Sequence, residues 1–337
     1  MTREERIKAA LQGKEVDRQP VSVWMHFSEF DQDPRSLAEH MVSFNEQFDY
    51  DFIKMVPFGA YSTPDWGAKV TIYCDKYKEP VVSAPGISSI EDYYGIKALP
   101  PIQGTWGKQL QLAQYTGKLV KKNTPFIQTI FAPTTTLRKL AGKRLIQDME
   151  QEPEAVHNAL VEITKTTIDF IKACVDAGVS GFFLATQCAA TDYMSAEQHA
   201  EFCKPYDLQV INSYKDATYF NVLHIHGNNI MFDIVKNYPV NCLNWHDRFI
   251  DGLDFAKART MSDKAFLGGI KDAPEIVDGV LKYDSFITRS TPAQIKEHIK
   301  QAIDMLGGKG LIVSPGCVAD PRVSDENLHA VRQAVEL

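Results

Sequence analysis

Two histidines and one cysteine lie at the ends of predicted strands. His224 and His226 occur in LHIHGNN (223–229), and Cys317 ends the apolar run GLIVSPGC (310–317). Side chains alternate across a strand, so the two imidazoles share one face. Two imidazole nitrogens and one thiolate suit zinc, which then keeps a fourth position for water or substrate. We therefore take these three residues as candidate metal ligands; the alternative is unmetallated histidines and a core cysteine.

The predicted strand VNCLNWHD (240–247) also ends in polar residues. His246 shares a strand face with Asn244, whereas Asp247 lies on the other face or in the loop. Either His246 or Asp247 is a candidate fourth ligand, partner of a ligand, or base. The alternative for each is that it only satisfies backbone groups at the strand end.

Two further candidate catalytic residues lie in the first two predicted strands. His26 shares a face with Trp24, and Lys54 places a charge within the apolar run DFIKMVPF (51–58). An inward Lys54 needs a partner such as Asp51 or an anionic substrate, because an unpaired buried charge is costly. The alternative is that Lys54 reaches outward to solvent between helices.

These candidates belong to a repeating pattern of strand followed by helix. Helix-period segments, such as those at 152–178 and 291–308, separate most of the apolar runs. The predicted strands cover 20–27, 51–58, 126–133, 181–187, 219–227, 240–247, 265–270 and 310–317. Eight such units in about 300 residues predict a single (β/α)8 TIM barrel, in which the ends of distant strands converge on one axis. No Gly-x-Gly-x-x-Gly or P-loop run follows the first strand, so a nucleotide-binding Rossmann fold lacks its motif.

Two segments fall outside the repeat. Thr2 and Glu5 form a capping box that predicts a short N-terminal helix ending at Gly13. The connection 59–125 is longer than a barrel loop needs, with a hairpin predicted in KVTIYCDKY and a helix over 107–121. Because it leaves the C-terminal end of the second strand, we expect a lid over the site, or equally a structural or dimer-forming excursion.

Composition excludes several classes of partner. The chain has 337 residues, 44% of them hydrophobic, and a formal net charge of -7, so nucleic acid and anionic membranes are poor partners. The charged N-terminus and the lack of any 18-residue apolar run predict a cytoplasmic protein. Six scattered cysteines without a Cys-x-x-Cys pair predict neither a disulfide framework nor a zinc ribbon.

Four segments together resemble the uroporphyrinogen decarboxylase superfamily over essentially the whole chain. They are TREERIKAALQGKEVDRQPVSVW (2–24), APTTTLRKLAG (132–142), LHIHGNN (223–229) and SPGCVADPRVSDENLHAV (314–331). The resemblance implies a (β/α)8 barrel and one of two activities. One branch decarboxylates uroporphyrinogen without a cofactor, and the other comprises zinc-dependent methyltransferases that work with corrinoid proteins. A homodimer is also implied by the resemblance.

The decarboxylase branch is a poor match. Its Arg-Gln-x-Gly-Arg run corresponds here to MHFSEFDQDPR, in which Arg35 is the one basic residue, and its Gly-His-Gly corresponds to Gly316-Cys317-Val318. Its Ser-Asp-Ile segment corresponds to the Lys54-bearing run DFIKMVPFG. An octacarboxylate must be held by cationic hydrogen-bond donors, which this chain lacks at those positions. The sequence therefore argues against decarboxylation of uroporphyrinogen.

The methyltransferase branch is the better match. It carries His-x-Cys after the fifth strand and Pro-Gly-Cys after the eighth, and this chain departs from it at His226, which replaces a cysteine. The matching residues are His224, Gly227, Asn228, Pro315, Gly316 and Cys317. Histidine is an acceptable zinc ligand, and a site with one thiolate fewer is a stronger Lewis acid.

The resemblance predicts a zinc-dependent methyltransferase that moves a methyl group between a small methoxy compound or thiol and a corrinoid. The chain has no Asp-x-His-x-x-Gly run for binding cobalamin, so we expect the corrinoid on a separate partner protein. The alternative is a metal-free decarboxylase or lyase acting on an organic acid, with Lys54, His26 and His246 as binding and proton-transfer groups.

Overall fold

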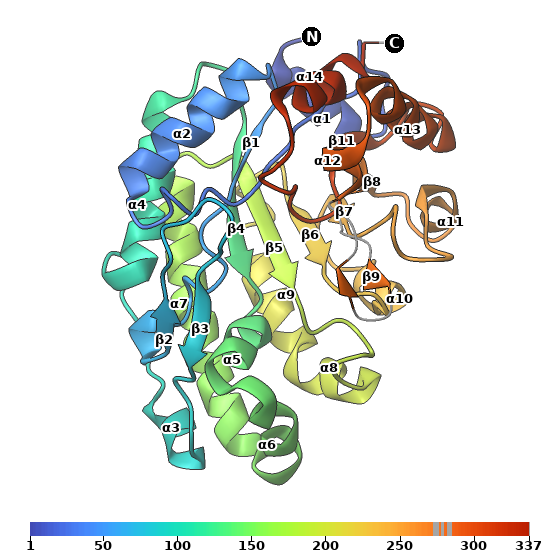
Figure 1. Ribbon diagram of the computed structural model, residues 1–337. Coiled ribbons are helices and arrows are strands. Elements are labelled where there is room, and N and C mark those ends of the chain that lie inside the picture. The colour runs from blue at the N-terminus through green and yellow to red at the C-terminus, as the bar shows by residue number, and fades with distance from the viewer. Residues whose placement is uncertain (272–275, 278–279, 282–284, 337) are drawn as a thin grey trace.

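The core of the protein is a curled sheet of parallel strands surrounded by helices (Figure 1). The computed structural model describes residues 1–271, 276–277, 280–281 and 285–336. Seven strands follow one another in chain order around the sheet: β1 (Ile53–Met55), β4 (Phe126–Phe131), β5 (Gly181–Thr186), β6 (Val222–Ile225), β7 (Cys242–Asn244), β8 (Ala265–Ile270) and β11 (Leu311–Pro315). Each falls within one of the predicted runs. The arrangement is α/β and consistent with a TIM-barrel-like fold.

The first predicted strand, 20–27, is not a regular strand. It forms one parallel bridge, between Val21 and Val313 of β11. On its other side, the backbone carbonyl of Val21 accepts a hydrogen bond of 2.8 Å from the backbone amide of Asp51. The segment therefore lies between β11 and the start of β1. The Ser22 hydroxyl donates a hydrogen bond to the Phe52 carbonyl, so the ladder of backbone hydrogen bonds does not continue. The prediction of eight regular strands was wrong at this point.

Helices pack against the outside of the sheet because each connection between parallel strands must return along it. Those that follow the strands are α5 (Pro133–Ala141), α6 (Leu145–Gln151), α7 (Pro153–Asp176), α8 (Ala196–Phe202), α9 (Lys204–Asn212), α10 (Phe232–Val235), α11 (Phe255–Arg259), α12 (Phe286–Arg289), α13 (Pro292–Met305) and α14 (Asp325–Gln333), with a 3₁₀ turn η2 (Gly142–Arg144). A short ribbon pairs β9 (Ile276–Val277) with β10 (Val280–Leu281). None of the helices within the described residues has the length and apolar character needed to cross a membrane.

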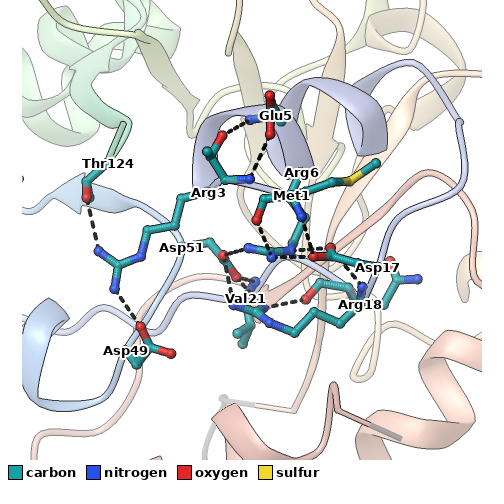
Figure 2. A network of polar contacts seen from close by, with 12 residues as sticks. Met1, Arg3, Glu5, Arg6, Asp17, Arg18, Val21, Asp49, Asp51 and Thr124 are labelled. Atoms are coloured by element: carbon teal, nitrogen blue, oxygen red, sulfur yellow. Dashed lines mark hydrogen bonds and ion pairs between the residues drawn. The ribbon is translucent and has the colours of Figure 1, made fainter. Parts of the chain in front are cut away.

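An ionic network joins the N-terminal helix α1 (Arg3–Leu11) to the start of β1 (Figure 2). The Asp51 carboxylate is fully buried and lies 2.6 Å from guanidinium nitrogens of both Arg6 and Arg18. It also accepts a hydrogen bond of 2.8 Å from the backbone amide of Val21. Asp51 is thus fully engaged here, which excludes it as the partner of Lys54.

The excursion 59–125 contains more regular structure than predicted. It forms η1 (Pro64–Trp66), β2 (Lys69–Thr71), β3 (Val81–Ala84), α3 (Ile90–Gly95) and α4 (Gly104–Leu119). The run KVTIYCDKY supplies β2 and the turn, whereas β3 lies beyond it. Helix α4 packs against α2 (Pro34–Gln47) and α7, so it belongs to the outer helices of the sheet. In Figure 1 the β2–β3 hairpin lies near the carboxyl ends of the strands, away from the two chain termini.

Candidate metal centre

The structure brings the three candidate ligands together. His224 lies on β6, His226 directly follows that strand, and Cys317 follows β11. One ligand atom from each residue lies within 4.8 Å of the others, and the Cys317 Sγ is 3.9 Å from the His226 Nδ1. His224 is buried, while the other two are partly exposed. Two nitrogens and one sulfur at this spacing form a donor set that fits a zinc ion after small side-chain adjustments.

Two glycines allow the chain to form this cluster. Gly227, directly after His226, has a φ of +119°, a backbone conformation that residues with a Cβ rarely adopt. A Cβ on Gly316 would lie 2.6 Å from the Trp245 carbonyl oxygen, so only glycine permits this close approach. The approach holds the end of β11 against the end of β7 and places Cys317 beside the histidines.

The orientation of His224 is fixed by Asn244 of β7. The His224 Nδ1 is 2.6 Å from the Asn244 Oδ1. The Asn244 amide nitrogen donates to the carbonyls of Leu267 at 2.7 Å and Pro315 at 3.2 Å, which leaves its oxygen to accept from His224. The Nδ1 of His224 therefore carries the proton, and its Nε2 lone pair is available to a metal.

Burial keeps His224 neutral. It lowers the pKa of His224 well below its ordinary value, and the nearby imidazoles of His226 and His246 add to the effect. Only a neutral imidazole can bind a metal ion, because protonation occupies both ring nitrogens. The electrostatics of the site thus favour the ligating form over a wide pH range.

A cavity of about 240 Å³ opens beside the three candidate ligands. Its lining combines apolar and ionisable side chains from several strands, the helix after β4, and the excursion. The lining residues are His26, Lys54, Val56, Pro57, Gly59, Glu79, Thr129, Phe131, Lys139, Phe183, Ala185, Gln187, His224, His226, Cys317 and Val318. Predicted catalytic residues His26 and Lys54 are among them.

Lys54 points inward, which rules out the alternative that it reaches outward to solvent between helices. Its side chain is buried, and its ammonium lies 4.4 Å from the ring centroid of Phe183 and 5.5 Å from that of Trp24. The Phe183 ring also stacks on the imidazole of His224, with ring centroids 5.1 Å apart. Burial lowers the pKa of Lys54 to about 8. Lys54 therefore places a cation within the cavity, and the Phe183 ring contacts both this cation and His224 of the candidate metal centre.

His26 connects the first predicted strand to the excursion. Its Nε2 is 3.3 Å from the carboxylate of Glu79, which is half-exposed at the edge of the cavity. Burial, together with the charges of Lys54 and Lys139, lowers the pKa of His26 to about 3, so the imidazole is neutral. Burial raises the pKa of Glu79. Glu79 and Gly59 are the cavity-lining residues contributed by the excursion.

His246 and Asp247 lie near the cluster but do not line the cavity. The ring centroid of His246 is 5.6 Å from that of His226 and 6.3 Å from that of His224. The Asp247 carboxylate instead accepts hydrogen bonds from the backbone amide of Gly269 at 3.1 Å, at the end of β8. His246 therefore lies beside the candidate ligands. Asp247, which follows β7, is held to the end of β8.

Lys139 is the cavity residue that sequence reasoning missed. It lies on α5, its ammonium donates to the Gly59 carbonyl, and it sits 3.5 Å from the ring centroid of Phe131. Burial lowers the pKa of Lys139 to about 7. The sequence signal that could have indicated Lys139 was a cation in the helix that directly follows a strand, within the APTTTLRKLAG segment.

Comparisons with known proteins show to which family the chain belongs. The family model for uroporphyrinogen decarboxylase (URO-D) matches residues 2–337. A methylcobamide:CoM methyltransferase (MtbA) of Methanosarcina acetivorans is 22% identical over 333 residues, covering 94% of this chain and 92% of the relative. The MtbA of Methanosarcina mazei is 22% identical over 244 residues, covering 72% of this chain and 67% of the relative.

A solved structure supports the same fold. A methyltransferase from Methanosarcina mazei superposes with a TM-score of 0.82 at 19% identity, covering 99% of this chain and 98% of that one. A B12-independent methionine synthase from a Shewanella species gives a TM-score of 0.57 at 12% identity, covering 94% of this chain and 91% of that one. The resemblance found in the sequence is confirmed: this chain belongs to the uroporphyrinogen decarboxylase family, and the sequence relatives described here are methyltransferases.

Proposed function

We propose that this protein is a zinc-dependent methyltransferase that moves a methyl group between a small methoxy compound or thiol and a separate corrinoid protein. The observation that carries the proposal is the meeting of His224, His226 and Cys317 at the edge of a cavity. The names of the relatives, methylcobamide:CoM methyltransferases, support the corrinoid as the second substrate.

In this proposal, His224, His226 and Cys317 hold the zinc. A bound zinc ion supplies Lewis-acid chemistry, drawing electron density from a sulfur or oxygen atom that joins it. The neutral His224 is kept in its ligating tautomer by Asn244, and the Cys317 thiol must lose its proton when metal binds. The apolar walls, including Phe131 and Phe183, exclude water from the atom that gives or receives the methyl group.

We assign the remaining candidates by their positions. His246 is placed to be a fourth ligand, because two imidazoles bound to one zinc have ring centroids about 5 to 6 Å apart. Lys54 and His26 line the cavity and are assigned to substrate binding. Asp247 is assigned to positioning, through its hydrogen bonds to Gly269. All the residues assigned these roles lie in the part of the chain that the structure describes.

The excursion is assigned to covering the site. Gly59 and Glu79 line the cavity, and Glu79 contacts His26 across its edge. A covering segment would have to admit the corrinoid on its partner protein and then exclude water during transfer. The homodimer remains a prediction from the resemblance.

A metal-free decarboxylase or lyase is the second candidate. The buried cations Lys54 and Lys139 favour it, since both would attract an organic acid. The cluster of two imidazoles and a thiol favours the methyltransferase, because metal-free acid chemistry has no use for such a donor set.

A methyl-transfer assay tests the proposal. The zinc-loaded protein is mixed with methylcobalamin and a small thiol, and the visible spectrum of the cobalamin is followed. Transfer forms a carbon–sulfur bond, breaks the cobalt–carbon bond, and leaves the electron pair of that bond on cobalt as cob(I)alamin. We expect turnover with wild type and loss with Cys317→Ala. Turnover that persists fully in Cys317→Ala, or after removal of zinc, would contradict the proposal.

A further inference from the structure

A buried ammonium in the cavity forms no ion pair with any residue that the structure describes; Cys317 and Glu79 act on its charge from a longer distance. In the part of the chain that the structure describes, Lys54 forms no hydrogen bond or ion pair, and its contacts are with the faces of Trp24 and Phe183. Only 6% of Lys54 is exposed. Aromatic faces offset part of the lost hydration, but a buried cation without an anion remains costly. Such an arrangement is expected where a ligand supplies the missing charge.

Lys139 presents a second ammonium to the same cavity from the helix α5. One of its hydrogen-bond donors is used on the Gly59 carbonyl, and its charge lies against the ring of Phe131. No carboxylate among the described residues forms an ion pair with it. An ammonium has three donors, so two remain for a ligand.

We propose that Lys54 and Lys139 together bind one anionic group, a carboxylate or a sulfonate, on the small molecule that carries or accepts the methyl group. The inference rests on the proposed function for the identity of that molecule. It deepens that function by assigning the substrate class: a small acid whose methyl-exchanging atom reaches the metal centre while its charged end lies between the two lysines.

The charges of the cavity-lining residues indicate how many negative charges the ligand carries. Among the described lining residues, Lys54 and Lys139 are cationic and Glu79 is the one carboxylate, while His26 is neutral. With both lysines protonated, two positive charges and one negative charge leave one positive charge to be balanced. A divalent metal bound by the Cys317 thiolate would keep one further positive charge, which lies at the metal end of the ligand. The balance therefore favours a ligand with a single negative charge at its lysine end.

The size of the cavity agrees with such a ligand. The cavity volume of about 240 Å³ leaves room for a small molecule. A short-chain acid fits this space. Burial lowers the pKa of Lys54 to about 8 and that of Lys139 to about 7, and a bound anion would favour the charged form of both lysines.

The first experiment measures anion binding by the metal-free protein. Binding of propionate and of its neutral counterpart propionamide to the metal-free protein is measured by calorimetry. We expect propionate to bind at least 10-fold more tightly, and Lys54→Met and Lys139→Met each to weaken propionate at least 10-fold. Lys264→Met is the matched control, because Lys264 is half-buried and bonds the Val240 carbonyl outside the cavity. Circular dichroism verifies that each variant is folded.

The second experiment separates this inference from the proposed function. The zinc-loaded protein is titrated with 3-mercaptopropionate and 3-mercaptopropionamide, which share a thiol and differ in charge. We expect the two lysine variants to bind 3-mercaptopropionate at least 10-fold more weakly than wild type does. Their affinity for 3-mercaptopropionamide and their zinc content should be unchanged. Equal affinity of wild type for acid and amide, or for propionate and propionamide, would overturn the anion site. Failure to load zinc would overturn the proposed function, while the propionate measurement would still decide the anion site.

Discussion

The Nδ1 atom of His224 lies 2.6 Å from the Oδ1 atom of Asn244, so the neighbouring strand β7 orients the imidazole of β6. Asn244 is itself held by the carbonyls of Leu267 on β8 and Pro315 on β11. One buried amide thereby links the strand that bears a candidate ligand to two further strands of the sheet. The candidate metal site is therefore anchored in the sheet through His224 and Asn244.

Removing the Asn244 amide should weaken metal binding. We expect Asn244→Ala to lower zinc affinity by about 10- to 100-fold, because the tautomer and orientation of His224 are no longer fixed. Competition with a chromophoric chelator measures the affinity. Asn241→Ala is the control, since the Asn241 side chain bonds Tyr219 and the amide of Asn221, outside the cluster. Equal zinc affinities for the two variants would contradict the role of Asn244.

His246 should contribute to metal affinity without being essential for it. We expect His246→Ala to weaken zinc binding about 10- to 100-fold, because its ring lies at the spacing of a further ligand. The same chelator competition measures the loss. The exposed His329 contacts Phe48 in a tilted arrangement away from the cluster, so His329→Ala should leave the affinity unchanged. An unchanged affinity in His246→Ala would remove this residue from the site.

The ionic network around Asp51 should support stability but not metal binding. We expect Asp51→Asn to lower the free energy of unfolding by about 3 to 5 kcal/mol, because Arg6 and Arg18 lose their buried counter-charge. Asp49→Asn is the matched control, since Asp49 pairs with Arg332 at the surface and should cost less than about 1 kcal/mol. Urea unfolding measures both. Zinc loss from folded Asp51→Asn protein would contradict the separation of network and site.

Anion binding should weaken as the pH rises. The pKa of Lys139 is lowered from its ordinary value to about 7 by burial and by Arg138, against the opposing charges of Glu79 and Cys188. The lysine is charged below this pKa and neutral above it, so propionate should bind best below pH 7 and lose affinity between about pH 7 and 9. Calorimetry on metal-free protein across this range measures the change. In Lys139→Met the loss of affinity should move to the higher pH at which Lys54, with a pKa of about 8, loses its proton, and a wild-type affinity that rises with pH would contradict the assignment.

The grouping of the three candidate ligands could be predicted from the sequence because parallel strands bring their ends together. His224, His226 and Cys317 all occur at strand ends, and a curled parallel sheet places such ends around one axis. The strand-helix order and the position of the excursion could be read for the same reason, from apolar periodicity. The family resemblance further pointed to the same three residues.

Other features depend on packing that periodicity does not encode. Lys139 lines the cavity from α5, and Asp51 binds Arg6 of α1 and Arg18 of the segment that follows α1. The segment 20–27 has a strand-like composition, but Ser22 bonds Phe52 through its side chain, so only one bridge forms. The strands β9 (Ile276–Val277) and β10 (Val280–Leu281) also lie outside the predicted strands.

The most direct test of the central claim is the metal content of the purified protein, measured by elemental analysis for wild type, His224→Ala and Cys317→Ala. The account predicts about one zinc per chain in wild type and strong loss in both variants, each of which should remain folded by circular dichroism. A wild-type protein that holds no metal and takes up none from added zinc would contradict it. So would variants that keep their zinc, because the metal would then lie elsewhere.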